Sequence, residues 1–288
     1  MNIRDLKYLI AVADYKHFGK AATACFVSQP ALSMQLNKLE EELGVKLFER
    51  TNKKVLITDV GIDIAERSRK IINDVNEINL IAKNYQDPFS GDLKLGAFPT
   101  LAPYILPKIV PKITKLYPNL KLLLVEEKTD ILIDKLNRGL IDIALLALPV
   151  STSDLEYQIL LEDKFYLAVP KNHKLAKNSC VSYSDINNES LLLLDEGHCL
   201  REQALDVCTI AGTTERPDFR ATSMETLRQM VINNVGITLI PKLAKKENDG
   251  LVYLSFKDYS PSRTIALVWR KSSIKKKSYT TIFNKIKI

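Results

Sequence analysis

The apolar residues at the start of the chain recur at helical spacing and are interrupted by short breaks. The pattern predicts a first helix, a second one of small residues over 20–25, a turn at 26–28 and a third helix over 31–43. One face of the third helix is apolar and carries Leu32, Leu36, Leu39 and Leu43. Ser28 is expected to cap this helix, with Pro30 in its first turn, and Gly44 to end it. Two short helices joined by a tight turn predict a helix-turn-helix.

The opposite face of the third helix is polar and faces outward if the leucines face the core. The residues on this face and along its edge are Ser28, Gln29, Pro30, Ser33, Met34 and Asn37. Ser, Asn and Gln side chains can hydrogen-bond base edges or phosphates when a recognition helix enters the major groove. The same pattern fits an exposed polar face with no partner, so the helix pair alone leaves DNA binding open.

A long helix is predicted from Thr58 to about Tyr85, with a narrow apolar seam. The seam consists of Ile64, Ile71, Ile78 and Tyr85, with Ser68, Val75 and Ala82 four residues later in each repeat. This spacing is typical of a coiled coil, so the seam is expected to meet another subunit. The alternative is a helix that lies against the chain's own C-terminal domain. The break QDPFSGD at 86–92 marks a domain boundary.

Strands and helices alternate after Gly91, which predicts an open α/β sheet with crossover helices. The predicted strands are 92–98, 121–127, 141–148, 165–170 and 236–241, and the predicted helices are 103–117, 130–138 and 221–234. In such sheets ligands bind where strands end and helices begin. Residues 96–100 and 126–129 are two such places.

The segment LLLLDEGHCLREQALDVC holds Cys199 and Cys208, nine residues apart. If the segment after Gly197 is helical, nine residues span about 13.5 Å, whereas the Cα atoms of a disulfide lie within about 7 Å. The thiols could therefore bond only if the helix unwinds. A helix N-terminus, His198 and Arg201 would favour a thiolate at Cys199. The alternative is two small buried side chains, and a metal site is disfavoured because only one His lies near two widely spaced thiols.

The composition suits a DNA-binding unit joined to a larger domain, with 288 residues, 46% of them hydrophobic and 26% charged. The net charge of +7 is mostly a C-terminal effect, because residues 271–288 hold six lysines and no acid. We therefore expect a solvated basic tail and take no evidence for nucleic acid from the total charge. With no signal peptide and no apolar run of about eighteen residues, the chain is expected to be soluble and cytoplasmic. That compartment keeps its four cysteines reduced.

The first 60 residues resemble the helix-turn-helix of LysR-type transcriptional regulators. The motifs that carry this resemblance are HFGKAA, VSQPALS, LEEELGVKLFER and the pair Thr58 and Gly61. The resemblance implies a DNA-binding regulator whose short wing also meets DNA, with Arg50, Thr51, Lys53 and Lys54 as candidates. It further implies a dimer through the linker helix, which presents two recognition helices to palindromic double-stranded DNA.

The resemblance also implies the fold: α+β overall, with an effector domain of two α/β lobes like those of periplasmic binding proteins. The expected domains are an all-α winged helix-turn-helix at 1–58, a linker and dimerisation helix at 59–87 and a regulatory domain at 88–288. Its two lobes are expected at 88–164 plus 265–288 and at 165–264.

The segment GHCLREQALDVC resembles that of peroxide-sensing members of this family, and RATSMETLRQMV, GITLIP and RTIALVW extend the likeness. The resemblance implies that Cys199 reacts with hydrogen peroxide and that Cys208 resolves the product as a reversible intramolecular disulfide. The refolded segment would alter tetramer packing and, with RNA polymerase as partner, activate oxidative-stress genes until a cellular thiol reductant restores the dithiol. Further residues would hold peroxide or support its pocket: Thr100, Thr129, His198, Gln203 and Arg263.

Two other functions fit parts of the chain. A LysR-type regulator could instead respond to a small organic effector in the cleft between the lobes. A thiol peroxidase would use the same cysteines, but an enzyme of that kind has no use for a helix-turn-helix, so no enzymatic activity is expected. No cofactor, metal or membrane partner is expected. Cys25 is expected in the core of the N-terminal unit, and Cys180 is assigned no function.

Overall fold

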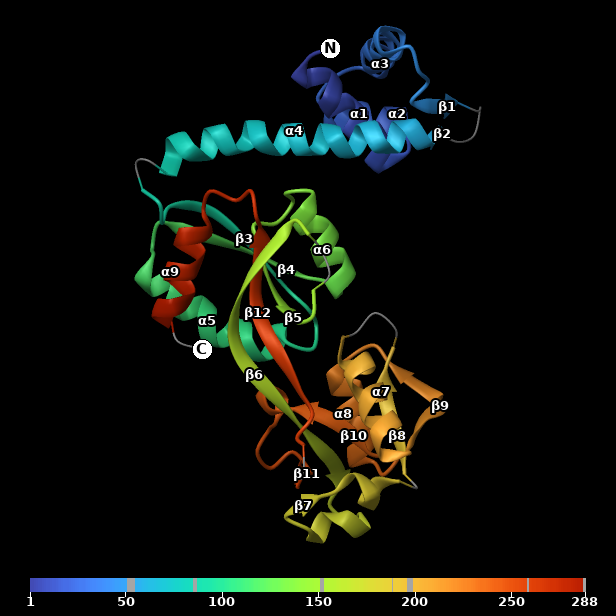
Figure 1. Ribbon diagram of the computed structural model, residues 1–288, viewed down its shortest axis with the longest axis vertical. Helices are drawn as coiled ribbons and strands as arrows, with labels where there is room; N and C mark the ends of the chain where they lie inside the picture. Colours follow the sequence, from blue (N-terminus) through green and yellow to red (C-terminus); the bar gives the residue numbers. More distant parts are fainter. Residues whose placement is uncertain are drawn as a thin grey trace. The chain divides into compact units, whose positions relative to one another are not determined.

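The chain divides into two compact units, Met1–Gln86 and Asp87–Ile288. The structure is a computed structural model that describes residues 1–50, 55–84, 87–150, 153–187, 189–195, 199–257 and 259–286 (Figure 1). None of the helices within these ranges is long and apolar enough to cross a membrane.

The first unit is a helix-turn-helix followed by a hairpin and a long helix, as predicted. Its elements are α1 Ile3–Tyr15, α2 Phe18–Ala24, α3 Gln29–Leu43, β1 Phe48–Arg50, β2 Val55–Ile57 and α4 Asp59–Asn84. The helix α2 begins two residues earlier than predicted, because His17 Nδ1 accepts hydrogen bonds from the backbone N–H groups of Gly19 and Lys20 at 3.0 and 3.3 Å.

The ends and the apolar face of α3 are as predicted. The Ser28 hydroxyl oxygen caps the helix by accepting a hydrogen bond from Ala31 N–H at 3.4 Å, and Gly44 ends it with a left-handed φ of 69°. The leucine face lies in the core of this unit, with Leu32, Leu36 and Leu39 fully buried and Leu43 partly buried.

A buried carboxylate ties α3 to the hairpin. Glu40 is 3% exposed, and its Oε1 accepts hydrogen bonds from the backbone N–H groups of Leu47 and Phe48 at 2.9 and 3.2 Å. Burial alone would raise the pKa of Glu40, but hydrogen bonds from Lys46, Leu47 and Phe48 lower it below its usual value. The recognition helix and the strand of the wing are therefore held together by an ionised group.

The start of α4 explains why Thr58 and Gly61 occur together. Thr58 Oγ1 accepts a hydrogen bond from Gly61 N–H at 3.0 Å and donates one to the Lys46 carbonyl oxygen at 2.8 Å. A Cβ atom at position 61 would lie 2.3 Å from the Leu47 carbonyl oxygen, so only glycine lets the long helix approach the wing this closely.

The second unit has two lobes. Its strands are β3 Gly91–Ala97, β4 Leu120–Glu126, β5 Ile143–Ala147, β6 Leu155–Pro170, β7 Cys180–Val181, β8 Ser190–Leu194, β9 Thr214–Ala221, β10 Thr238–Pro241, β11 Leu251–Phe256 and β12 Ser262–Arg270. Its helices are α5 Ala102–Leu116, α6 Thr129–Asn137, η1 Lys174–Lys177, η2 Tyr183–Ile186, α7 Cys199–Ala211, α8 Met224–Ile232, η3 Lys242–Ala244 and α9 Lys276–Ile286. The predicted two-lobed α/β architecture is confirmed.

The strand β6 runs from one lobe into the other (Figure 1). Its first part, through Lys164, pairs antiparallel with β12 beside the parallel strands β5, β3 and β4. From Phe165 onward it pairs with β10 and β11 instead. The pattern predicted only the second half of this strand, because the first half mixes polar and apolar residues on a surface that is partly exposed.

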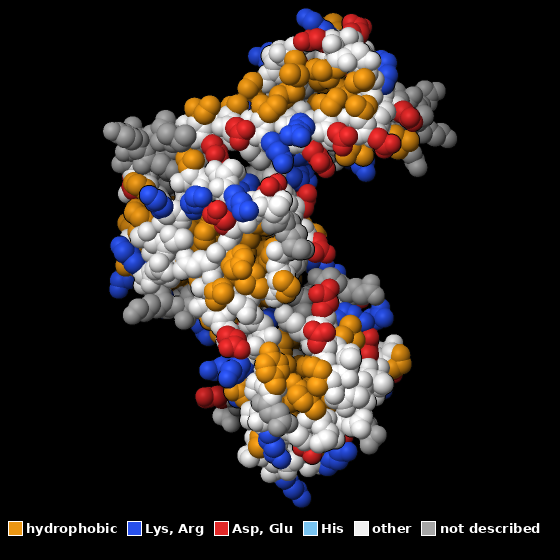
Figure 2. Space-filling view, viewed as in Figure 1, with side chains coloured by type: hydrophobic (Ala, Val, Ile, Leu, Met, Phe, Trp, Pro, Cys, Tyr) orange, Lys and Arg blue, Asp and Glu red, His pale blue; other side chains and the backbone are white. Residues whose placement is uncertain are grey.

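Each lobe has its own core. The first lobe packs β3, β5 and β12 against α5, α6 and α9. The second lobe has one core that includes Cys208 and the apolar face of α7, and another built around α8. Exposed hydrophobic side chains also gather on both lobes, on the face that Figure 2 shows. Among the exposed large hydrophobic residues of this unit are Tyr157, Ile159, Ile210 and Tyr259.

The expectation of a solvated basic tail is wrong. The last described helix is α9, and its face of Tyr279, Ile282, Phe283 and Ile286 is buried in the core of the first lobe. These four residues recur at helical spacing, so the helix is amphipathic and its lysines occupy mainly the outer side. The prediction of a solvated tail rested on the number of lysines and did not take the apolar face into account.

Candidate functional site

The polar face of α3 is available to a partner. Gln29, Pro30, Met34 and Asn37 are exposed, and Ser33 is partly exposed. Ser28 is exposed as well, although its hydroxyl also caps the helix. Of the wing candidates, the side chain of Arg50 and the whole of Thr51, Lys53 and Lys54 lie outside the described part of the chain.

The apolar seam of α4 serves two purposes along its length. Its first part belongs to the N-terminal unit, because Ile64 packs against the core of that unit and Ser68 is 2% exposed. Further along, Ile71 and Ile78 are 42% and 66% exposed. The side chain of Ala82 and the whole of Tyr85 are outside the described residues. The exposed stretch of the seam is thus the part that a second helix could cover.

The two cysteines of interest lie on one helix. Cys199 is the first residue of α7, and Cys208 lies near its end. Nine residues of α-helix correspond to about 13.5 Å between their Cα atoms, roughly twice the separation that a disulfide allows. The predicted mechanical constraint therefore applies: a bond between these thiols requires α7 to unwind.

The Cys208 thiol is held unreactive in this conformation. Its side chain is 5% exposed in the core of the second lobe. Burial, together with the nearby Glu215 carboxylate, raises the pKa of Cys208 to about 11, although Arg201 lowers it in part. Because the thiolate is the nucleophile, Cys208 is a poor one at neutral pH while α7 is intact.

This raised pKa predicts how Cys208 reacts with iodoacetamide. In the reduced Cys199→Ser protein, the rate of Cys208 alkylation is expected to increase with pH, and the midpoint of this increase should lie near pH 11. For an ordinary thiol the midpoint lies at about pH 8.5. Site-resolved mass spectrometry would give the rate at each pH, with urea-unfolded protein as control. A midpoint below pH 9 in the folded protein would contradict the burial of this thiol.

Arg201 forms an ion pair with Glu215, a residue that the sequence did not indicate as part of the site. Its Nη1 and Nη2 donate to the two carboxylate oxygens of Glu215 at 2.6 and 2.7 Å, and Nη1 also donates to the Leu194 carbonyl oxygen at 3.1 Å. The hydrogen bond from Arg201 lowers the pKa of Glu215 below its usual value. The charge of Arg201 is therefore offset by Glu215.

Thr100 and Arg263, both singled out from the sequence, lie together in a buried cluster. Arg263 Nη1 donates to Thr100 Oγ1 at 2.9 Å. Its Nε and Nη2 donate to Asp163 Oδ2 at 3.0 and 2.9 Å. All three residues are at most 2% exposed. Because Thr100 Oγ1 accepts from arginine, its own proton is left to be donated elsewhere.

The other predicted pocket residues are distributed more widely. Thr129 begins α6, and its hydroxyl oxygen is buried with no hydrogen-bond partner among the described residues. Gln203 lies on α7 and lines a pocket of the second lobe that neither Thr100 nor Arg263 lines. It follows Cys199 by four residues in α7. His198 is outside the described residues.

Sequence reasoning missed the two carboxylates that hold these arginines. Asp163 precedes Arg263 by 100 residues, and Glu215 follows Arg201 by 14. Neither pair has a local spacing signal, since strand pairing and helix packing bring the partners together.

The comparisons with known proteins identify the class. Residues 3–62 match the family model of the bacterial regulatory helix-turn-helix protein, lysR family, and residues 86–279 match that of the LysR substrate binding domain. Together these matches span most of the chain. The protein belongs to the LysR family of transcription regulators, as the sequence motifs predicted.

Within this family the chain resembles OxyR. It is 42% identical over 291 residues to the DNA-binding transcriptional dual regulator OxyR of Escherichia coli (strain K12), covering 100% of this chain and 95% of the relative. It matches a structure of full-length OxyR from Pseudomonas aeruginosa with a TM-score of 0.82 and 32% identity, covering 100% of this chain and 95% of that one.

The regulatory unit also matches crystal structures of the reduced and the oxidized form of OxyR. Both have a TM-score of 0.64, with 37% and 39% identity, and each covers 70% of this chain and 96% of the other. Relatives of this kind therefore exist in two redox forms.

Proposed function

We propose that this protein is a cytoplasmic, DNA-binding transcription regulator, mainly an activator of oxidative-stress genes, that hydrogen peroxide switches through a reversible Cys199–Cys208 disulfide. The observation that carries this proposal is the placement of both cysteines on α7, at a separation that forbids a bond until the helix unwinds. Relatives named hydrogen peroxide-inducible genes activator, at up to 44% identity, support the choice of signal.

The chemistry takes two steps. The Cys199 thiolate attacks one peroxide oxygen, so that an S–O bond forms, the O–O bond breaks and one water leaves after protonation. The Cys208 thiol, once released from its core, attacks the sulfenic sulfur, loses its proton and expels a second water. Two thiols and one peroxide thus give one disulfide and two waters. A cellular thiol reductant returns the two electrons and two protons.

The assignment of the two roles follows from the contrast between the cysteines. Cys199 begins α7, where the helix dipole favours an anion. Cys208 is buried with a raised pKa, so it does not compete for peroxide before α7 opens. This contrast supports the first thiol as the peroxidatic one and the second as the resolving one.

A small set of polar groups would hold the peroxide. The Thr100 hydroxyl, fixed by Arg263, and the unpartnered Thr129 hydroxyl can both hydrogen-bond to it. Arg263 acts as a positioning residue, because its nitrogens are committed to Thr100 and Asp163. His198 and Gln203 complete the proposed pocket from the segment that holds Cys199.

DNA binding and assembly complete the proposal. Residues 1–58 bind a palindromic operator, residues 59–87 dimerise and residues 88–288 sense peroxide. Oxidation repacks the regulatory domains of a tetramer, and RNA polymerase receives the signal. The protein acts as a regulator and not as an enzyme, since one oxidation per reduction cycle is enough for a switch and the chain devotes its first 58 residues to DNA.

Stoichiometric oxidation tests this function. Reduced protein on operator DNA would receive one equivalent of hydrogen peroxide, followed by footprinting and transcription in vitro with RNA polymerase. The wild type is expected to change its footprint and activate transcription, whereas Cys199→Ser should do neither. Equal activation in both proteins would exclude the proposed switch, even if DNA binding were unaffected.

The recognition helix can be tested separately. Asn37→Ala is expected to weaken operator binding about tenfold, because a side chain that reads a base edge contributes about 1–3 kcal/mol, and to leave binding to unrelated DNA unchanged. Glu41→Gln, an exposed change on the same helix, should affect both DNAs alike. An equal loss on both DNAs for Asn37→Ala would show that Asn37 does not read sequence.

The exposed part of the linker seam predicts a dimerisation defect. A double Ile71→Glu and Ile78→Glu variant should weaken the dimer at least tenfold, because like charges would face each other across the seam. Sedimentation equilibrium would measure the dissociation constant. Glu66→Gln, an exposed change on the same helix, is the control. A double variant as dimeric as the wild type would place the interface elsewhere.

A further inference from the structure

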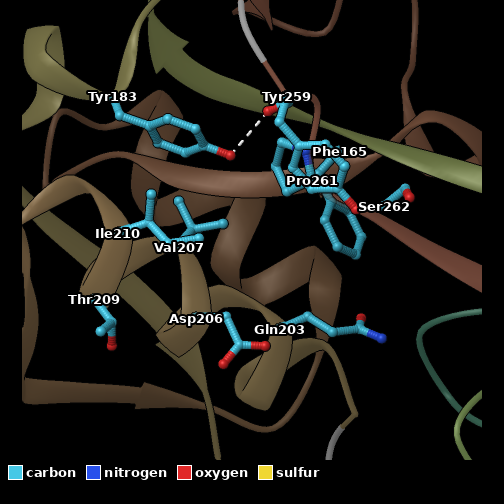
Figure 3. Close-up of a pocket in the computed structure, with 10 residues that line it drawn as sticks. All are labelled: Phe165, Tyr183, Gln203, Asp206, Val207, Thr209, Ile210, Tyr259, Pro261 and Ser262. Atoms are coloured by element: carbon cyan, nitrogen blue, oxygen red, sulfur yellow. Dashed lines mark hydrogen bonds between the residues drawn. The ribbon is translucent and has the colours of Figure 1, made fainter.

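The second lobe contains a pocket that shares Gln203 with the proposed peroxide site and none of that site's other described residues. It has a volume of about 380 Å³, which is within the usual range of small-molecule sites. Its ten lining residues are Phe165, Tyr183, Gln203, Asp206, Val207, Thr209, Ile210, Tyr259, Pro261 and Ser262 (Figure 3). None of them comes from residues 87–164, the part of the chain that holds Thr100 and Thr129.

Half of this pocket is made by α7. Gln203, Asp206, Val207, Thr209 and Ile210 all belong to that helix, and the first three lie between the two cysteines. The facing wall is η2 and the loop before β12, joined where the Tyr183 hydroxyl donates to the Tyr259 carbonyl oxygen at 2.9 Å (Figure 3). The pocket therefore depends on α7 being helical.

The lining specifies the chemistry of a ligand. The centre is apolar, formed by the side chains of Val207, Ile210, Tyr183 and Pro261 (Figure 3). Asp206 is the only charged residue among the ten described lining residues. The Oε1 atom of Gln203 is buried and has no hydrogen-bond partner within the described part of the chain. A ligand with an apolar body and a positively charged hydrogen-bond donor would complement the Asp206 carboxylate and the Gln203 Oε1 atom. A carboxylate on the ligand would be repelled by Asp206 and could not donate a hydrogen bond to Gln203.

We propose that this pocket binds a small arylalkylamine and that binding holds the protein in its reduced form. The volume accommodates on the order of a dozen non-hydrogen atoms, which suits one aromatic ring with a short aminoalkyl chain. The effect on the redox state rests on the proposed function, because a Cys199–Cys208 disulfide unwinds α7 and so removes half of the site. A ligand that binds only the helical form shifts the equilibrium towards it.

The first experiment measures binding to the reduced full-length protein by calorimetry. The probe is phenethylamine, and phenylacetate is its matched control with a carboxylate in place of the aminomethyl group. Phenethylamine should bind about tenfold more tightly than phenylacetate. Asp206→Asn should weaken phenethylamine binding about three- to fivefold, as expected for an exposed charge, and Glu202→Gln, which removes an exposed charge of α7 outside the pocket, should not. Equal affinity of the two probes, or no effect of Asp206→Asn, would overturn the ligand assignment.

The second experiment measures the coupling in a glutathione redox buffer, where one protein dithiol and one oxidised glutathione give one protein disulfide and two reduced glutathiones. At ten times its dissociation constant, phenethylamine should raise the ratio of reduced to oxidised protein about tenfold, which is a potential more positive by about 30 mV for two electrons. At the same concentration, Asp206→Asn should show a smaller shift. Binding without any shift would overturn the coupling alone. A failure of the disulfide to form in every sample would overturn the proposed function and the coupling with it, while the calorimetric result would still decide the ligand.

Discussion

The Asp163→Asn variant is expected to lose about 3 kcal/mol or more of the free energy of unfolding of the regulatory unit. Both side chains of the Asp163–Arg263 pair are 0% exposed, so the substitution leaves a guanidinium charge buried without its counter-charge. Removing one partner of such a pair typically costs about 3–5 kcal/mol. Asp163 Oδ1 also accepts a hydrogen bond from Leu243 N–H at 3.0 Å, so the site links β6 to η3 as well.

Urea unfolding of the full-length protein would measure this loss. Trp269 is the single tryptophan of the chain, and it is buried in the core of the first lobe. Its fluorescence therefore reports on this unit, and the midpoint of the transition gives the change in stability. Glu162→Gln, which alters the exposed neighbour of Asp163, should stay within about 0.5 kcal/mol of the wild type.

A second variant separates charge burial from loss of packing. Replacing the pair with apolar residues, in Asp163→Leu with Arg263→Met, should recover much of the stability lost in Asp163→Asn, because the buried charge is gone. The same double variant should lose peroxide sensitivity, since Thr100 is no longer positioned. An Asp163→Asn protein within 1 kcal/mol of the wild type would show that the pair does not hold the lobe together.

The Cys208→Ser variant is expected to lose peroxide-dependent activation of transcription, down to the level of Cys199→Ser. Cys199 should still be oxidised to the sulfenic acid, because its reaction with peroxide does not involve the second thiol. Without Cys208 no intramolecular bond forms, and nothing obliges α7 to unwind. The proposal therefore predicts a chemically oxidised but transcriptionally inactive protein.

A dimedone adduct on Cys199, read by mass spectrometry beside a transcription assay, would test this prediction. Cys180→Ser provides the matched control, because Cys180 is a partly buried cysteine of the same lobe and should leave activation intact. Full activation in Cys208→Ser would mean that the sulfenic acid alone is the signal.

The local features of the sequence predicted much of this structure. The leucine face, the Ser28 cap and the Gly44 end of α3 are short-range patterns, and each occurs where predicted. The alternation of strands and helices also predicted the α/β regulatory unit. Such patterns succeed because each is decided within a turn or two of backbone.

Long-range features could not be read in the same way. Helix packing and strand register determine the partners of Arg201 and Arg263. No sequence spacing predicts that these partners are Glu215 and Asp163. The pocket beside α7 likewise joins residues from η2, α7 and the loop before β12. The helix α9 is a different case. The helical spacing of Tyr279, Ile282, Phe283 and Ile286 is visible in the sequence, but the prediction was based on the charge of the segment and not on this spacing.

The central claim is that oxidation joins Cys199 to Cys208 and thereby unwinds α7. One measurement tests it directly: non-reducing peptide mapping combined with hydrogen exchange of the full-length protein, before and after one equivalent of hydrogen peroxide. The expected result is a linked pair of peptides containing Cys199 and Cys208, together with lost amide protection across α7 and retained protection in α5 and α9. A 199–208 disulfide with α7 still protected, or no such disulfide at all, would contradict the claim.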